Sequence, residues 1–375
     1  MGAWETWLAD EAARRDAAGL TRRLRPRGAD DDVIDLAGND YLGLSRDPLV
    51  ASAAADAALT WGAGAGASRL VTGTLSLHTT LEQELAMFLA QPAALVMSSG
   101  YHANLAAVTA LVDRDCFIVS DGHVHASLID AARLSRAEIA VTPHNDVAAV
   151  AALLDQRRGG RRCLVLVESV YSVLGDAAPL VELAAVCEEH DALLVVDEAH
   201  GIGVAGPSGE GLVRALGLAG LPHVVVTATL SKSLGAQGGA LLGSPALVEH
   251  LVNRARPFIF DTALAPAAAA GALAALRLLR SAPDLPARVR SRVVGLADLL
   301  GVEAPAGAVL SVPMPSPQAA LAAQAACLDH GVRVGCFRPP SVPDGISRLR
   351  VTTNAGVPDD AWQRASDVLL EVVHG

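Results

Sequence analysis

Two strand-like segments each end in side chains that could do chemistry on a bound molecule. Residues 193–196 form an apolar run that leads to Asp197, with His200 three positions later, and residues 224–227 form another that leads to Lys232. Ligands bind at the carboxyl ends of the strands in an open α/β sheet. A carboxylate there can hold a positively charged ring nitrogen, and a lysine amine can form an imine with a carbonyl compound. Asp197 could equally be a helix N-cap with His200 incidental.

Lys232 is the single lysine of the chain, so 28 of the 29 basic residues are arginine. An arginine is not deprotonated in a protein, whereas a lysine amine can lose its proton and attack a carbonyl carbon. A position where lysine survives this composition is a candidate for chemistry that arginine cannot do. The alternative is one surface lysine that escaped the bias by chance.

Asp197 and Lys232 together are the two side chains that a pyridoxal phosphate site most needs. Two serines precede Gly100 where a helix is expected to begin, and free N–H groups and the helix dipole favour an anion at such a point. Thr229 and Ser231, beside the lysine, could add hydroxyl contacts to a phosphate. The Gly100 segment could also be an ordinary turn between a strand and a helix.

Other motifs carry weaker signals. His123 and His125 form a His-x-His pair, but no third ligand at a familiar spacing supports a metal, and a histidine stacked on a flat cofactor or buried for structural reasons is the better interpretation. Residues 201–206 match Gly-x-Gly-x-x-Gly, but they do not follow the strand directly and a proline comes where a helix should run. Arg338 and Arg350 could grip a carboxylate at two points, or could be solvated surface residues.

The elements that must position these residues alternate along the chain. Apolar runs without polar alternation predict parallel strands covered on both faces, and the helix-like segments between them predict right-handed βαβ crossovers in one large α/β domain. The expected strands are 94–97, 116–120, 139–142, 163–167, 193–196, 224–227 and 238–243. The expected helices are 104–112, 126–134, 147–157 and 180–190.

The sequence changes character after residue 265. A long helical stretch runs to Arg280, and prolines at 283 and 286 interrupt it. The expected later elements are strands at 309–312, 332–334 and 348–352, and helices at 318–330 and from 358 onward. We therefore expect three parts: an N-terminal helix and arm (1–40), a large α/β domain (41–265) and a smaller C-terminal α+β domain (266–375).

Composition excludes several classes of protein. The chain has 375 residues, of which 51% are hydrophobic and 18% charged, and this excludes disorder. The net charge of −11 argues against nucleic acid and anionic membranes as partners, and five cysteines without a CxxC pair suit a reducing compartment. Residues 1–20 predict a charged amphipathic helix rather than a signal peptide, and the longest uncharged stretch, 262–276, is too short to span a bilayer. We expect a cytoplasmic protein.

Six motifs resemble the α-oxoamine synthases, which are pyridoxal phosphate enzymes of the aspartate aminotransferase fold (fold type I). The motifs lie at 39–44 (NDYLGL), 68–73 (SRLVTG), 125–128 (HASL), 196–201 (VDEAHG), 229–232 (TLSK) and 338–340 (RPP). The likeness covers nearly the whole chain, in the family's order. It implies a large, mostly parallel sheet and a smaller C-terminal α+β domain. The chain most resembles the members that join L-alanine to a pimeloyl thioester in biotin biosynthesis, with release of CO2 and the thiol carrier.

The resemblance also implies roles for individual residues. Lys232 would carry pyridoxal phosphate and later remove the α-proton of alanine, Asp197 would pair with the pyridine nitrogen, and His125 would stack on the ring. The other implied cofactor contacts are Gly100, Tyr101, Glu168 (near the substrate carboxylate), Ser172, His200, Thr229 and Thr262, the last reaching the phosphate from a second subunit. The implied substrate contacts are Arg22, Asn39, His125, Arg338, Ser341 and Arg350, with Arg350 or Arg338 on the alanine carboxylate.

Two departures from the family pattern matter. The N-terminal substrate arginine is either Arg22 or Arg23, and Ser231 stands where relatives often have glycine. The family and Thr262 imply a homodimer with shared sites, and the acyl carrier is either coenzyme A or acyl carrier protein. Glycine C-acetyltransferase, 5-aminolevulinate synthase and serine palmitoyltransferase stay open as alternatives within the family. More distant alternatives are an aminotransferase and a scaffold without activity, and the retained Lys232 argues against the scaffold.

Overall fold

The computed structural model describes residues 1–375 except 1, 23, 158–159, 340–341 and 343. It divides into two units, of which the first ends at Val33 and the second runs from Ile34 to Gly375. The first unit contains helix α1 (Ala3–Ala17), in which no residue is buried. This confirms the helix predicted for residues 1–20. Within the described part of the chain, no helix has the length and apolar character needed to cross a membrane.

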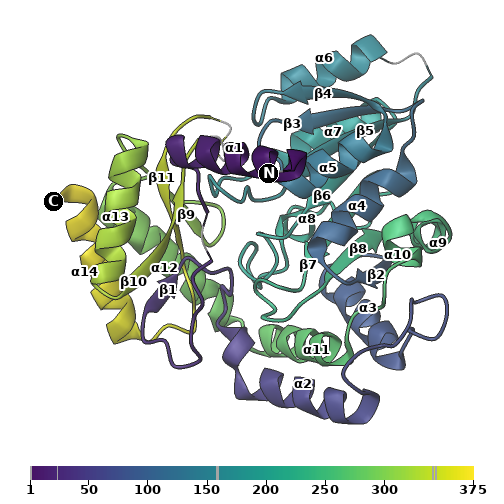
Figure 1. Cartoon of the computed structure of the whole chain (residues 1–375). Helices are drawn as coiled ribbons and strands as arrows, with labels where there is room; N and C mark the ends of the chain where they lie inside the picture. The colour runs from purple at the N-terminus through teal and green to yellow at the C-terminus, as the bar shows by residue number, and fades with distance from the viewer. Residues whose placement is uncertain (1, 23, 158–159, 340–341, 343) are drawn as a thin grey trace. The chain divides into compact units, whose positions relative to one another are not determined.

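A seven-stranded sheet lies at the centre of the second unit (Figure 1). Its strand order is β2-β8-β7-β6-β5-β3-β4, with β8 antiparallel to both neighbours and the pairs from β7 to β4 parallel. The strands are β2 (Ala93–Met97), β3 (Phe117–Asp121), β4 (Glu138–Thr142), β5 (Cys163–Glu168), β6 (Ala192–Asp197), β7 (Val224–Thr229) and β8 (Gly239–Gly243). Each strand that the sequence predicts in this region is confirmed, with ends shifted by no more than two residues.

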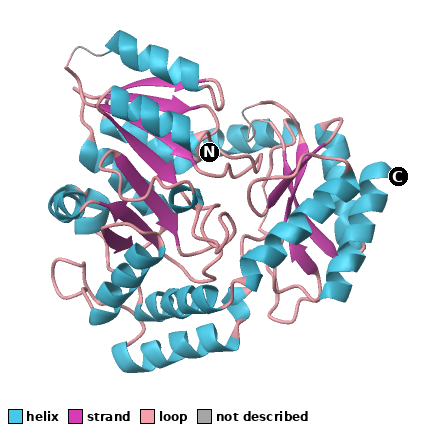
Figure 2. Ribbon diagram, turned by 180° about the vertical axis from the view of Figure 1, so that it is seen from behind, coloured by secondary structure: helices cyan, strands magenta, loops and turns pink. Residues whose placement is uncertain are grey.

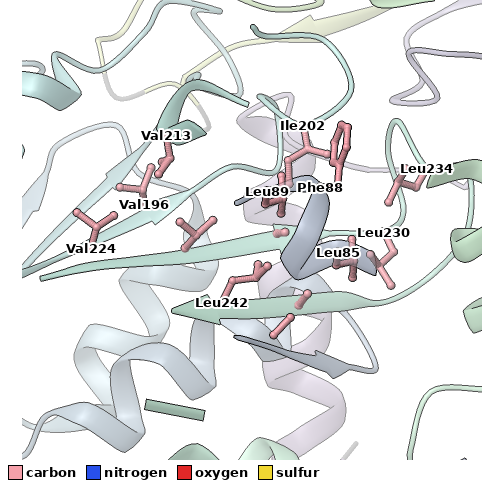
Figure 3. Close-up of a cluster of buried hydrophobic side chains, with 14 of the residues drawn as sticks. Leu85, Phe88, Leu89, Val196, Ile202, Val213, Val224, Leu230, Leu234 and Leu242 are labelled. Atoms are coloured by element: carbon pink, nitrogen blue, oxygen red, sulfur yellow. The ribbon is translucent and has the colours of Figure 1, made fainter. Parts of the chain in front are cut away.

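Helices cover both faces of this sheet (Figure 2). One face carries α4 (Gly100–Leu111), α5 (Ala126–Ser135), α9 (Pro245–Arg254) and α10 (Arg256–Ile259). The other carries α2 (Pro48–Trp61), α3 (Ser76–Phe88), α6 (Val147–Arg157), α7 (Leu180–Glu189) and α11 (Pro266–Ser281). Alternate residues of a strand therefore enter different apolar cores: Val195 packs on the α4 side, and Val196 packs on the α3 side. Figure 3 shows Val196 in the second of these cores, with Leu85 and Phe88 of α3. This alternation is why the inner strands are apolar along most of their length.

A four-stranded sheet has the order β1-β10-β11-β9. Its strands are β1 (Ile34–Leu36), β9 (Val309–Pro313), β10 (Val332–Phe337) and β11 (Arg348–Thr352). Its apolar core is shared with α12 (Asp284–Leu300), α13 (Pro317–Asp329) and α14 (Asp359–His374). A sheet of this kind agrees with the smaller α+β part implied by the resemblance, and the limits of the three domains stay predictions.

The helix α12 was missed by the sequence analysis. Pro283 is its N-cap residue and Pro286 lies in its first turn. Proline is tolerated there because the N–H groups of a first helical turn have no partner within the helix. The two prolines therefore separate α11 from a new helix instead of ending helical structure.

Candidate active site

The carboxyl ends of β5, β6 and β7 place the predicted site residues side by side. In the parallel register Glu168 lies beside Asp197, and Asp197 lies beside Thr227. All three residues are buried. Lys232 follows β7 by three residues in the connection to β8, so the chain's one amine comes to the same edge as the two carboxyl groups. The fold therefore brings Asp197 and Lys232, which the sequence places after two separate strands, to one edge of the sheet, with Glu168 beside Asp197.

The amine of Lys232 takes part in a chain of hydrogen bonds. Its Nζ lies 2.9 Å from Nε2 of His200, and Nδ1 of His200 lies 2.7 Å from the hydroxyl of Tyr41. Tyr41 donates to Oδ1 of Asn39 at 3.1 Å. Burial lowers the pKa of His200 well below its usual range, and burial raises the pKa of Tyr41 to about 12, so both side chains stay neutral. Lys232 thus donates to Nε2, and the Nδ1–H of His200 donates to Tyr41.

The electrostatics around Lys232 favour a free amine. Burial lowers its pKa, Asp197 and Glu168 oppose this effect, and Arg350 adds to it. The net result is a lysine pKa below its ordinary value. Removing water disfavours the charged ammonium form, which is how proteins prepare a lysine to act as a base or nucleophile.

Asp197 and Glu168 differ in how their oxygens are satisfied. Oδ1 of Asp197 accepts from the N–H of Ala199 at 2.9 Å, and Oδ2 accepts from Nδ2 of Asn104 at 2.7 Å. Oε2 of Glu168 accepts from the N–H of Ser172 at 3.1 Å, whereas its buried Oε1 has no partner among the described residues. Burial, together with the charge of Asp197, raises the pKa of Glu168 to about 8. Glu168 therefore offers a partly protonated carboxyl group with one oxygen free to bind a ligand.

His125 caps the N-terminus of α5. Its Nδ1 accepts from the N–H of Ser127 at 3.2 Å and lies 2.7 Å from the Ser127 hydroxyl. The residue is exposed, yet the groups packed behind the ring remove enough water to lower its pKa. His123 has a different environment, because its ring stacks on His144 at 4.3 Å. The two histidines of the His-x-His pair therefore have different environments: the ring of His123 is stacked on His144, and His125 is exposed.

The turn between β2 and α4 forms a cradle suited to an anion. Ser99 caps α4 by accepting from the N–H of His102 at 3.1 Å. A Cβ at Gly100 would lie 2.9 Å from Cβ of Thr229, so only glycine fits there. Thr229 in turn lies 2.7 Å, oxygen to oxygen, from Ser231. The helix N-terminus, the missing side chain and the two hydroxyls suit a phosphate group.

Tyr101, next to this cradle, turns its side chain elsewhere. Its hydroxyl donates to Oδ2 of Asp130 at 2.6 Å, and this hydrogen bond raises the tyrosine pKa. Tyr101 therefore has its backbone N–H, rather than its hydroxyl, to offer to a phosphate.

Arg350, a buried residue of the four-stranded sheet, contacts two residues of the site. Nε of Arg350, on β11, donates to the carbonyl oxygen of Ser172 at 2.7 Å, and Nη2 donates to Oδ1 of Asn39 at 3.1 Å. Asn39 thus accepts from both Tyr41 and Arg350. A buried guanidinium beside these groups suits the binding of a carboxylate.

Arg338 and Thr262, two further predicted residues of the second unit, make other contacts. Arg338 follows β10. Burial raises the pKa of the Cys336 thiol, and the guanidinium of Arg338 partly opposes this effect. Thr262 is exposed and lines a small pocket together with Ser98 and Asp261. Arg22 belongs to the N-terminal unit, which is described by itself. Ser341 lies outside the described residues, as does Arg23.

Four residues that contact the predicted ones, directly or through one another, were not among the predicted site residues: Tyr41, Asn104, Ser127 and Thr227. Tyr41 and Ser127 stand within the motifs that carried the family resemblance, which was the available signal. Asn104 carries no such signal, because a lone asparagine in an alanine-rich helix has no distinctive pattern.

The donor set fits pyridoxal phosphate. Lys232 offers an amine of lowered pKa for the carbonyl carbon, and Asp197 offers a carboxylate for the ring nitrogen. The Gly100 turn, which a Cβ would fill, offers room and N–H groups for the phosphate.

Comparisons with known proteins agree with this site. The family model for aminotransferase class I and II matches residues 31–369. The 8-amino-7-oxononanoate synthases of Mycolicibacterium smegmatis and Mycobacterium marinum are each 54% identical to this chain, over 368 and 371 residues, which is 98% of this chain and 96% and 95% of theirs.

Solved structures give the same picture. Serine palmitoyltransferase from S. paucimobilis, with a bound PLP–myriocin aldimine, superposes with a TM-score of 0.90 at 30% identity, over 99% of this chain and 98% of that one. The 8-amino-7-oxononanoate synthase of Francisella tularensis gives a TM-score of 0.78 at 27% identity, over 92% of this chain and 98% of that one.

Proposed function

The chain belongs to the 8-amino-7-oxononanoate synthases, within the aminotransferases of class I and II, and we propose that it joins L-alanine to a pimeloyl thioester in biotin biosynthesis. The products are 8-amino-7-oxononanoate, CO2 and the free thiol carrier. The 54% identity to a relative of that name, over 98% of this chain, carries the proposal. The hydrogen-bonded Lys232 amine beside two buried carboxyl groups supports it.

When bound, pyridoxal phosphate supplies an electron sink for the negative charge that develops at Cα of alanine and, later, when CO2 leaves. Lys232 would bind its carbonyl carbon, Asp197 would pair with its ring nitrogen, and His125 would contact the ring. The Gly100 turn holds the phosphate, and the other proposed contacts are Tyr101 through its backbone, Glu168, Ser172, His200 on the ring oxygen side, and Thr229.

Lys232 removes the α-proton of alanine. This step needs an amine without its proton, and the burial that lowers the pKa of Lys232 favours that form. His200 is neutral, so its Nε2 accepts a hydrogen bond from Lys232 and holds the nitrogen in place between proton transfers.

Arg350 holds the carboxylate of alanine. The guanidinium is buried and oriented by Ser172 and Asn39, so it is positioned before the substrate binds. The other proposed substrate contacts are Asn39, His125, Arg338, Ser341 and Arg22.

We also propose a homodimer in which Thr262 reaches the phosphate bound in the partner subunit, and an intracellular enzyme that works in the cytoplasm. The exposed position of Thr262 suits a contact made across an interface. The acyl group arrives on coenzyme A or on acyl carrier protein, two carriers that present the same thioester.

A product assay tests this function. Protein loaded with pyridoxal phosphate receives alanine with pimeloyl-coenzyme A or pimeloyl acyl carrier protein, and matched reactions contain glycine with acetyl-coenzyme A or serine with palmitoyl-coenzyme A. We expect 8-amino-7-oxononanoate and CO2 from the alanine reactions alone. Product from the serine reaction alone would contradict the proposal and favour the activity of the structural relative.

A second experiment tests the covalent attachment. Borohydride reduction of the loaded protein should fix the cofactor on Lys232, which peptide mapping locates. Lys232→Arg retains the positive charge and should take no label. A label on any other residue would overturn the role of Lys232.

A further inference from the structure

Asn104 of α4 lies at the centre of a buried hydrogen-bond network that the proposed mechanism does not use. Its Nδ2 donates to Oδ2 of Asp197 at 2.7 Å and to the hydroxyl oxygen of Ser127 at 2.8 Å. Its Oδ1 accepts from the hydroxyl of Thr227 at 2.6 Å. These four residues are no more than 5% exposed, so water does not substitute for any of the partners.

The chemistry of the partners sets the direction of every bond. Asp197 already accepts a backbone N–H at its other oxygen, and a carboxylate accepts, so the NH2 end of the Asn104 amide must face it. The carbonyl end then faces Thr227, whose hydroxyl must donate. The hydroxyl oxygen of Ser127 accepts the second N–H of the amide, which leaves its own O–H to donate to Nδ1 of His125 at 2.7 Å.

An independent contact agrees with this direction. The backbone N–H of Ser127 also points at Nδ1 of His125, at 3.2 Å, and an N–H can only donate. Nδ1 of His125 is therefore an acceptor in both contacts. A neutral imidazole with an acceptor at Nδ1 carries its proton on Nε2.

We propose that Asn104 is a positioning residue that acts on two parts of the site at once: it holds the carboxylate of Asp197 in place and, through Ser127, keeps the proton of His125 on Nε2. The proposal rests on the proposed function for the identity of the ligand that these two residues meet. The lowered pKa of His125 agrees with a neutral ring. His125 then presents an N–H donor at Nε2, on the side of the ring remote from Ser127.

The tautomer is measured by nitrogen NMR on protein without cofactor, labelled at histidine, with the His125 signals assigned by their loss in His125→Gln. We expect the Nε2-protonated form in the wild type. In Asn104→Ala and Ser127→Ala the Nδ1-protonated form should appear as a minor second population, because the hydroxyl of Ser127 is free to turn or is absent and only the weaker backbone N–H contact at 3.2 Å still donates to Nδ1. A wild-type proton on Nδ1, or an unchanged tautomer in both variants, would overturn the proposal.

Kinetics of the loaded enzyme give a second readout. Thr227→Val deletes the hydroxyl that orients the amide at nearly constant volume, and we expect kcat to fall about tenfold. Thr227→Ser restores the hydroxyl and should restore kcat. Thr142→Val removes another buried threonine hydroxyl of the same sheet and should leave kcat unchanged. Equal rates for Thr227→Val and Thr227→Ser would contradict the proposal.

The NMR and kinetic experiments distinguish a failure of the role proposed for Asn104 from a failure of the proposed function. Should the wild-type enzyme fail to condense alanine with the pimeloyl thioester, the proposed function fails, while the NMR experiment on the cofactor-free protein still decides the role of Asn104. A folded Ser127→Ala protein keeps the test available if Asn104→Ala does not fold, since Ser127 lies between Asn104 and His125.

Discussion

Two hydrogen-bond networks meet at the candidate active site, and they are built differently. The bridging network joins residues that lie far apart in the sequence, four of them in loops and Arg350 on β11 of the four-stranded sheet: Lys232, His200, Tyr41, Asn39 and Arg350. The buried network stays within the seven-stranded sheet and its covering helices: Thr227, Asn104, Asp197, Ser127 and His125. The difference indicates that the cofactor contacts are held rigidly by one core, whereas the reactive amine depends on contact between the two sheets.

Asp197→Ala should have the largest effect, because it removes the carboxylate that both the buried network and the ring nitrogen of the cofactor require. We expect kcat to fall about 10²–10³-fold. The N–H groups of Asn104 and Ala199 would also lose their acceptor. Steady-state kinetics check this, with exposed Asp360→Ala as control. A loss below tenfold would show that the buried network matters less than the bridging one.

Arg350→Ala should break the bridging network at the four-stranded sheet. Loss of a charge-assisted contact to a carboxylate predicts a KM for alanine raised about 10–100-fold. Kinetics with alanine and the thioester varied separately test this, and exposed Arg364→Ala is the matched control. If the KM for the thioester rises and the KM for alanine does not change, Arg350 binds the acyl substrate instead of alanine.

Tyr41→Phe should have an intermediate effect. It removes the acceptor of the His200 Nδ1–H, which is buried, and we expect kcat to fall about tenfold. Combined with Ser127→Ala, the losses should multiply, because residues of separate networks act independently. If the kcat of the double variant equals that of the slower single variant, the two networks act as one unit and the proposed separation is wrong.

His144→Gln should have the smallest effect, on stability rather than rate. Nδ1 of His144 lies 2.9 Å from Asp121 and Nε2 lies 2.8 Å from Asp176, and these carboxylates raise its pKa to about 9 against the opposing effect of burial. Because the folded pKa exceeds the unfolded one, the stabilisation is complete below about pH 6.5 and is lost as the pH rises through about 9.

At pH 6 we expect His144→Gln to unfold about 3–6 °C below the wild type, and at pH 10 at nearly the same temperature. Thermal unfolding followed by circular dichroism tests this, with exposed His374→Gln as control. A deficit that does not shrink at high pH would mean that the His144 contacts are not charge-dependent.

Much of the fold could be predicted because its signals are local. Continuous apolar runs mark strands buried on both faces, and the residue that ends each run marks the site. Asp197 was singled out because it ends such a run, and Lys232 because it is the chain's one lysine and follows another run by five residues. The helix α12 was missed because Pro286 stops a helix in the interior but not in the first turn, and this distinction depends on where the helix begins.

The amino-acid sequence by itself determined the family, the alternation of strands and helices, and the presence of Asp197 and Lys232 after two of the strands. Only the tertiary structure decided which groups touch. Asn104 in α4 reaches Asp197 across 93 positions, and Arg350 reaches Asn39 across 311. The physical reason is that a buried polar side chain takes whatever partner the packing of sheets and helices brings within hydrogen-bond distance, and residue type and spacing along the chain do not contain that distance.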